Sequence, residues 1–164
     1  MTVEQITLRA VTAADEAFLL SVYASTRGEE MKLVPWTAEQ KEAFVKMQYA
    51  AQKQHYQAMH PAANHAIICV GETQVGRVYV DRNAEELHIL DITVLPEFRG
   101  RGAGQTVLRR LMHEAGADGK AVTIYVESFN PSLRLFERLG FQKEREEGFQ
   151  LLLKRPAQPQ QRAR

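Results

Sequence analysis

Three glycines alternate with other residues in the segment Arg99-Gly100-Arg101-Gly102-Ala103-Gly104. Glycine lets backbone N–H groups approach a ligand closely, and apolar residues at helical spacing directly behind it place the positive end of a helix dipole at the same point. The two arginines can add charge-assisted hydrogen bonds to an anion. The segment therefore predicts a loop that binds a diphosphate at the start of a helix.

The same loop also has a purely conformational interpretation, because turns and helix starts use glycine without a ligand, and arginines beside them are often only solvated. The order of the elements favours the ligand. An apolar strand over Leu87–Leu95 precedes the loop, and an amphipathic helix follows it. The apolar stripe of that helix consists of Val107, Leu108, Leu111, Met112 and Ala115.

Two polar residues, His88 and Asp91, interrupt the apolar strand ahead of the loop. An imidazole has an ordinary pKa of roughly 6.5 and can take up a proton near neutral pH. His88 is therefore a candidate general base, with a histidine held by core hydrogen bonds as the alternative. Asp91 is a second candidate, and we expect it to act as a structural hydrogen-bond acceptor.

The other elements must position this segment, and their periodicities predict an α/β fold with a mixed sheet. The strand Leu87–Leu95 is apolar at both parities, so we expect it at the centre of the sheet and buried on both faces. We expect a loop or broken helix from Arg27 to Pro35, between two helices. Strands are predicted over 6–9, 66–70, 75–80, 87–95, 122–126, 141–143 and 149–154, and helices over 12–23, from 37 past 51, from the glycines to 116 and from 131 to 140.

A chain of 164 residues, 45% hydrophobic and 25% charged, is typical of one globular domain, which we place at residues 5–155. A net charge of +1 does not suit a nucleic-acid partner, and no stretch approaches the ~20 apolar residues of a membrane span. We therefore expect neither partner, and a cytoplasmic location. Residues 156–164 are predicted to form a flexible tail, and Cys69, the only cysteine, a buried thiol.

The chain resembles the GNAT acyltransferase superfamily, whose acyl-CoA motif is Arg or Gln, two residues, Gly, one residue, then Gly or Ala. Arg99, Gly102 and Gly104 fill that pattern, and the stretch from Asn130 to Phe141 resembles the family's second motif. The resemblance spans about residues 6–155. It implies a seven-stranded, mostly antiparallel sheet in the order strand, helix, helix, three strands, helix, strand, helix, two strands, splayed between strands four and five.

The same resemblance implies that acyl-CoA lies in the gap between those two strands, with acetyl-CoA as the expected donor and no metal. Its pantetheine arm would act as a substitute strand on the main chain of Thr93, Val94 and Leu95. Asn130 would hydrogen-bond to the cofactor or shape its own loop. The diphosphate would bind to the residues of the glycine segment, namely Arg99, Gly100, Arg101, Gly102, Ala103 and Gly104.

Acyl transfer to an amine requires a neutral amine, a stabilised oxyanion and a proton for the departing thiolate. In the histone-modifying branch of the family, the base lies eleven residues before the Arg or Gln of the motif, which is the position of His88. Many members supply the acid from a Tyr in the second motif, where this chain has Phe136. Tyr125 or Ser128 could take that role, or water could protonate the thiolate.

The missing hydroxyl leaves two functions open. One is an N-acetyltransferase acting on a primary amine of a small molecule or peptide, and the other is an acyl-CoA-binding regulatory domain with weak catalysis. Replacing Phe136 with Tyr is expected to leave folding intact and to raise turnover, unless the ring points into the core.

The acceptor site in this family is bounded by the first two helices and their connection. Glu29 and Glu30 lie there and could hold a cationic amine, or they could simply be solvated. A homodimer is left open. A nucleotide-binding Rossmann fold is disfavoured, because its glycine fingerprint follows the first strand of a βαβ unit, whereas this loop follows the fourth strand.

Overall fold

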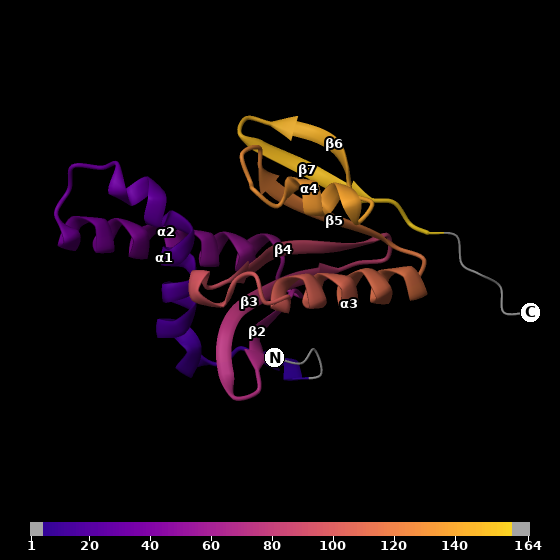
Figure 1. The fold of residues 1–164 in the computed structure, drawn as a ribbon, viewed down its shortest axis with the longest axis horizontal. Helices are drawn as coiled ribbons and strands as arrows, with labels where there is room; N and C mark the ends of the chain where they lie inside the picture. The colour runs from indigo at the N-terminus through magenta and orange to yellow at the C-terminus, as the bar shows by residue number, and fades with distance from the viewer. Residues whose placement is uncertain (1–4, 159–164) are drawn as a thin grey trace, which may run out of the picture.

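The computed structural model describes residues 5–158 and shows a seven-stranded sheet with helices on both faces (Figure 1). The strand order across the sheet is β1-β2-β3-β4-β5-β7-β6, so the predicted α/β class with a mixed, mostly antiparallel sheet is confirmed. The strands are β1 (Ile6–Ala10), β2 (Asn64–Val70), β3 (Thr73–Arg82), β4 (Glu86–Val94), β5 (Ala121–Glu127), β6 (Gln142–Glu147) and β7 (Gln150–Arg155). The helices are α1 (Glu16–Lys32), α2 (Ala38–Met59), α3 (Ala103–Ala117) and α4 (Leu133–Arg138), with short 3-10 helices η2 (Ala13–Asp15) and η3 (Pro96–Phe98).

β4 and β5 are parallel neighbours, and their ladder is short. It runs over four residue pairs, from Glu86 with Ala121 to Ile89 with Ile124. Both strands continue beyond this point, where β4 pairs only with β3 and β5 only with β7. The predicted splay between strands four and five is therefore present, and in Figure 1 the group of β5, β7 and β6 stands apart from β2, β3 and β4.

The main core lies between the sheet and α3. Inward-pointing side chains of β3, β4 and β5 pack there against the apolar stripe of α3 that the sequence predicted. A smaller core on the other face joins α1 and α2 to β2 and includes the thiol of Cys69, which is buried and free as predicted. Because α3 is packed along its length, its first turn is fixed relative to the end of β4.

The segment from Arg27 to Pro35 was predicted to be a loop or broken helix, and most of it is the end of α1. The prediction was wrong because one glycine, Gly28, costs a helix only about 1 kcal/mol. An ion pair one turn apart, between Arg27 and Glu30, and the packing of α1 against α2 offset that cost.

β4 is the central strand of the sheet, as predicted, but it is not buried on both faces. Tyr79 of β3 pairs with Asp91, whereas the next residue, Val80, pairs with Ile89, so Leu90 is an extra residue in β4. From this bulge onward β4 is only half-buried. The cause is the combination of the bulge and the splay, which leaves one edge of the strand uncovered.

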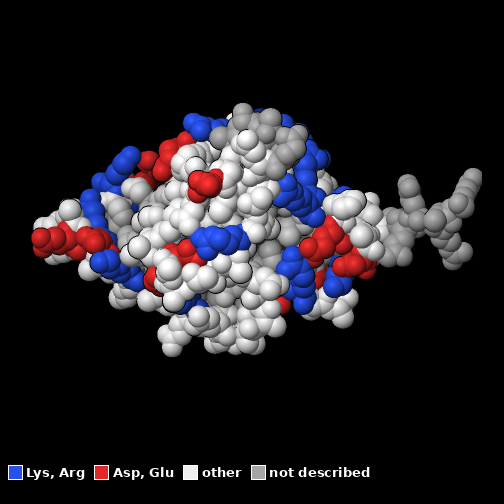
Figure 2. All heavy atoms as spheres, turned by 90° about the horizontal axis from the view of Figure 1, so that it is seen from below, with Lys and Arg blue, Asp and Glu red and all other residues white. Residues whose placement is uncertain are grey.

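β6 forms one edge of the sheet. All of its side chains are exposed, and all except Gln142 are charged. On the face of the molecule seen from below, acidic and basic side chains are mixed at both ends, with a mostly uncharged area between them (Figure 2).

Within residues 5–158, no helix is both long and apolar enough to cross a membrane. The same range holds no cluster of three or more His, Cys, Asp or Glu side chains that could bind a metal ion. Of the predicted tail, residues 156–158 lack regular secondary structure, and residues 159–164 lie outside the described residues.

Candidate functional site

Where β4 and β5 diverge they form a fork, whose last paired residues are Ile89 and Ile124. The first residues beyond it are Leu90, at the bulge, and Tyr125. The carbonyl oxygen of Leu90 accepts a hydrogen bond of 3.1 Å from the phenol of Tyr56 in α2. Burial raises the pKa of Tyr56 to about 12, so the phenol stays protonated and α2 is tied to the fork.

The glycine segment connects η3 to α3 and has the backbone that its sequence predicts. Gly100 and Gly102 have φ angles of 78° and 86°, in the left-handed region, and Gly102 is the N-cap of α3. A Cβ atom at Gly104 would lie 3.3 Å from the side chain of Val94, so this glycine allows close packing of α3 on β4. The first N–H groups of a helix have no intrahelical partner, and this end of α3 therefore suits an anion.

The main chain after the fork is partly engaged by β3. The N–H of Leu95 donates to the carbonyl oxygen of Val75 at 2.8 Å, so it is not free to bind a pantetheine arm. Main-chain groups alternate in direction along a strand, which turns those of Val94 toward the gap. In agreement with this, the Val94 carbonyl oxygen accepts a hydrogen bond of 3.0 Å from the side chain of Arg99. Of Thr93, Val94 and Leu95, Val94 is the residue whose main chain faces the gap.

Two other residues predicted to bind the cofactor contact protein atoms. The guanidinium of Arg101 lies 5.9 Å from the centre of the Phe98 ring. The side-chain oxygen of Asn130 accepts a hydrogen bond of 2.7 Å from the N–H of Ser132. Asn130 therefore shapes the turn that precedes α4, which is one of the two roles considered for it.

The two candidate catalytic residues, His88 and Tyr125, line one cleft of about 440 Å³. Their rings meet edge to face, with centroids 5.8 Å apart. The cleft lies between the end of α2 and the strands β4 to β7, so five elements distant in the sequence contribute to it. The other lining residues are His60, Glu86, Thr123, Glu144, Arg145 and Leu152.

His88 lies in the ladder beside Thr123 of β5. Its Nδ1 atom is 2.7 Å from the hydroxyl oxygen of Thr123, and that hydroxyl donates to Glu86 at 3.2 Å. Burial lowers the pKa of His88 below its ordinary value, and the nearby carboxylate of Glu86 partly opposes this. The imidazole is therefore neutral near pH 7 and can accept a proton.

Tyr125 is the β5 residue directly beyond the fork, and its phenol oxygen accepts a hydrogen bond of 2.8 Å from Arg145 of β6. Arg145 is in turn paired with Glu147 at 2.6 Å. Because a guanidinium can only donate, the hydroxyl of Tyr125 keeps its own proton to donate elsewhere. This arrangement allows Tyr125 to serve as a proton donor at the fork.

Sequence reasoning missed two neighbours in β3, Gly76 and Arg77. Arg77 is 3% exposed and donates to Asp91 at 2.6 Å and to Gln52 of α2 at 2.7 Å. Asp91 also accepts from the hydroxyl of Thr93, so it is a structural acceptor. A Cβ atom at Gly76 would collide with the carbonyl oxygen of Thr93, so only glycine lets β3 approach β4 there. In the sequence, a glycine and an arginine inside an apolar strand were the signal that could have pointed to these two residues.

Glu29 and Glu30, the candidate acceptor-binding residues, do not line this cleft. The side chain of Glu29 is 91% exposed and pairs with Lys32, and Glu30 pairs with Arg27. Arg27 also lies 3.7 Å from Glu127, at the end of β5. Arg27 therefore links α1 to the end of β5 beyond the fork.

Phe136, at the position where many relatives have Tyr, is 6% exposed. Its ring packs edge-on against Phe141 with centroids 5.4 Å apart, and both belong to the main core. The ring therefore points into the core. The expectation that Phe136→Tyr leaves folding intact and raises turnover loses its basis, because the new hydroxyl would enter apolar surroundings.

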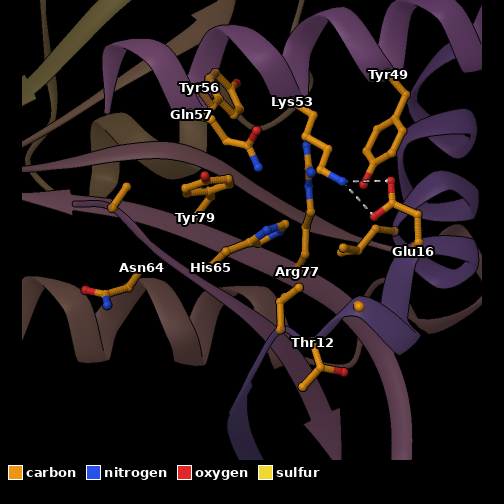
Figure 3. Close-up of a pocket in the computed structure, with 14 residues that line it drawn as sticks. Thr12, Glu16, Tyr49, Lys53, Tyr56, Gln57, Asn64, His65, Arg77 and Tyr79 are labelled. Atoms are coloured by element: carbon orange, nitrogen blue, oxygen red, sulfur yellow. Dashed lines mark hydrogen bonds and ion pairs between the residues drawn. The ribbon is translucent and has the colours of Figure 1, made fainter. Parts of the chain in front are cut away.

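A second cavity of about 380 Å³ lies between the helices α1 and α2 and the strands β2 and β3 (Figure 3). Lys53 and Glu16 form an ion pair of 3.2 Å at its wall. His65 stacks on Tyr79 at 4.3 Å, and its buried Nε2 atom has no hydrogen-bond partner among the described residues. Burial lowers the pKa of His65 to about 4. None of the site residues predicted from the sequence lines this cavity.

Solved structures share this fold. The PaiA N-acetyltransferase of Thermoplasma acidophilum, in complex with coenzyme A, has a TM-score of 0.71 and 17% identity over 95% of this chain and 99% of that one. PH1933 from Pyrococcus horikoshii has a TM-score of 0.69 and 18% identity over 94% of this chain and 99% of that one. The ribosomal-protein-S18-alanine N-acetyltransferase of Escherichia coli has a TM-score of 0.66 and 15% identity over 96% of this chain and 97% of that one. At such identities the likeness shows the fold alone.

The sequence itself gives the family. No curated protein sequence matches the chain significantly. A family model described as the acetyltransferase (GNAT) family, however, matches residues 29–141, which is more than half of the chain and includes the fork, the glycine segment and α4. The chain therefore belongs to the GNAT family of acetyltransferases.

Proposed function

We propose that the chain is an N-acetyltransferase that moves an acetyl group from acetyl-CoA to a primary amine of a small molecule or a peptide. One observation carries the proposal. The ladder of β4 and β5 stops at Ile89 and Ile124, and the freed edge of β4 leads directly into the glycine segment. An unpaired strand edge suits an amide-bearing arm, and the start of α3 suits a diphosphate.

In this proposal the donor binds through main-chain groups. The pantetheine arm would pair with β4 at Val94, between Thr93 and Leu95, and the diphosphate would bind from Arg99 to Gly104. The side chain of Arg99, which now donates to the Val94 carbonyl oxygen, would turn toward the diphosphate. The PaiA structure, whose fold this chain shares, contains coenzyme A, which supports the assignment.

Proton transfer would be assigned to the cleft at the fork. The thioester supplies an activated acyl group: the amine nitrogen bonds to the acyl carbon, the carbon–sulfur bond breaks, and the thiolate leaves. His88 would accept the proton that the amine must lose, because its imidazole is neutral near pH 7 and lines the cleft. Tyr125 would give a proton to the thiolate, because its hydroxyl keeps a free proton beside Arg145.

Calorimetry of coenzyme A binding tests the donor site. Gly102→Asp is expected to weaken binding by at least roughly 100-fold, since a carboxylate there repels a diphosphate at short range. Gly71→Asp is a matched control, because Gly71 also has a positive φ angle, 59°, and open space around it, but lies in the β2–β3 turn. Retained affinity in Gly102→Asp would contradict the proposed donor site.

A panel of amines, polyamines, amino acids and peptides with acetyl-CoA, with free thiol release as readout, tests the reaction. Turnover with at least one primary amine is expected. Residue 136 is Phe, which lacks the hydroxyl of the usual acid, and this favours the second candidate function, an acyl-CoA-binding domain with weak catalysis. Tight binding of coenzyme A without turnover on any acceptor class would establish that candidate instead.

A further inference from the structure

Three side chains in the cleft form a chain of hydrogen bonds across the β4–β5 ladder. His88 Nδ1 is 2.7 Å from Thr123 Oγ1, and Thr123 Oγ1 is 3.2 Å from Glu86 Oε2. Thr123 is 2% exposed, so its hydroxyl is largely shielded from bulk water. Which of these three side chains donates in each hydrogen bond therefore depends on the three side chains themselves.

The hydroxyl of Thr123 has one proton, and its two neighbours differ in what they can accept. The carboxylate of Glu86 can only accept, so its hydrogen bond with Thr123 requires the hydroxyl proton to point to Glu86. The contact between His88 Nδ1 and the same oxygen is then a hydrogen bond only if Nδ1 carries a proton. A neutral imidazole has one N–H, so a proton on Nδ1 leaves the lone pair on Nε2.

We propose that Thr123 and Glu86 are positioning residues that hold His88 as the tautomer protonated on Nδ1, so that Nε2 is the atom that accepts the proton of the acceptor amine. The assignment of proton transfer to His88 rests on the proposed function, whereas the tautomer itself does not. Glu86 acts through Thr123, and neither residue has to touch the substrate.

The surroundings of His88 support a free Nε2 atom. Within residues 5–158, Nε2 of His88 makes no hydrogen bond and is not among the buried unpaired atoms, and the residue lines the cleft. The groups that face it are His60 just after α2, Asp81 of β3, Glu86 of β4, Thr123 and Tyr125 of β5, and Glu144 and Arg145 of β6. Its hydrogen bond to Thr123 is therefore the contact that decides the tautomer.

His60 provides an internal reference in the same cleft. It stacks on His88 with ring centroids 5.9 Å apart, and its Nδ1 atom is 2.7 Å from Asp81 Oδ2. A carboxylate can only accept, so His60 is also protonated on Nδ1. This contact does not involve Thr123, so a change at Thr123 should alter one of the two imidazoles and leave the other as it was.

Long-range ¹H–¹⁵N NMR spectra of the uniformly labelled protein, assigned with His60→Gln and His88→Gln, read the tautomers without any substrate. In the wild type, His88 is expected to show a protonated Nδ1 and a bare Nε2. Thr123→Val keeps the shape and burial of the side chain but removes the hydroxyl, so the Nδ1–H preference of His88 should be lost while that of His60 stays. Thr123→Ser should restore it.

The pH dependence of the rate supplies a second readout, with an acceptor taken from the amine panel. His88→Gln should abolish the fall in rate on the acid side, because that limb reports protonation of Nε2. Thr123→Val should lower kcat on the plateau by roughly three- to tenfold, with KM for acetyl-CoA unchanged, because only part of the population then presents a lone pair at Nε2. Thr123→Ser should recover most of the rate. Glu86→Ala should move the acid limb to lower pH, since it removes a negative charge that favours protonated His88.

The outcomes separate this proposal from the proposed function. A wild-type spectrum with the proton on Nε2 of His88, or a Thr123→Val protein with unchanged tautomer and rate, overturns the positioning role, whether or not the chain acetylates amines. If the spectra are as expected but no amine is acetylated, the proposed function fails, and the tautomer assignment is supported by the spectra alone.

Discussion

On the α3 face of the sheet, the buried side chains of the main core are all apolar, whereas the α2 face holds Arg77, Thr123 and His88 in chains of hydrogen bonds. The stability of the first face depends on the volume and shape of its packed side chains. The second combines a smaller apolar core with these paired polar groups, and the loss of a partner there is costly because it leaves a buried polar atom unpaired. Substitutions and pH should therefore act differently on the two sides of one sheet.

The largest effect is expected on the α2 face. Arg77→Leu leaves Asp91, whose side chain is 25% exposed, without its cation and should cost about 3 kcal/mol of unfolding free energy. Urea unfolding measures this. Replacing both partners, as Arg77→Leu with Asp91→Leu, should recover most of the loss, because no charge is then left unpaired. A double variant no more stable than the single one would show that Arg77 acts through packing rather than through its partners.

A comparable effect is expected on the α3 face. Leu111→Ala removes a nearly buried side chain from the main core and should cost about 2–4 kcal/mol, through lost burial and the cavity left behind. Leu33→Ala, at a side chain that is 87% exposed, is the control and should change stability by less than about 0.5 kcal/mol. On this face the cost should be the same at about pH 7 and about pH 5.

Phe136→Tyr tests whether the α3 face tolerates a polar atom. Its ring lies in the main core, so a hydroxyl without a partner should cost about 1–3 kcal/mol and leave turnover unchanged. Thermal unfolding and the thiol-release rate measure the two quantities. A variant that is equally stable and faster would mean that the ring edge faces the donor slot instead.

The last effect is the dependence of stability on acid, which is expected on the α2 face. Burial lowers the pKa of His65 to about 4, against roughly 6.5 in the unfolded chain, so the unfolded state binds more protons between these values. The contribution of neutral His65 to the free energy of unfolding is fully present above about pH 6.5, and it is lost as the pH drops toward about 4. In His65→Phe, which keeps a ring against Tyr79, this fall should be shallower. An equal slope in urea unfolding from about pH 7 to about pH 4.5 would exclude His65 as the cause.

The features predicted from the sequence are those that depend on local patterns. The glycine segment, the stripe of α3 and the central place of β4 each come from residues adjacent in the chain. Periodicity also predicted the strands, although it shortened β6, whose residues are all exposed and show no apolar alternation. The end of α1 differs from the prediction because a helix tolerates a single internal glycine such as Gly28.

The cleft was predicted only in part, because its residues come from five elements. His88 and Tyr125 were candidates, but nothing local indicated that Thr123 and Glu86 would form a hydrogen-bond chain with His88. Their contact depends on the parallel register of β4 with β5, which is a tertiary property. The bulge at Leu90 was equally invisible in an apolar strand, although it decides which side chains beyond the fork face α2.

The charged edge strand β6 has a consequence for self-association. Sheet edges can pair with an edge of another copy, and proteins commonly prevent this by placing charges on the edge strand. From Lys143 to Glu147 every side chain of β6 is charged, on both faces of the sheet. A second copy that extended the sheet here would strip water from these charged side chains. Any dimer of this chain should therefore leave β6 exposed to solvent.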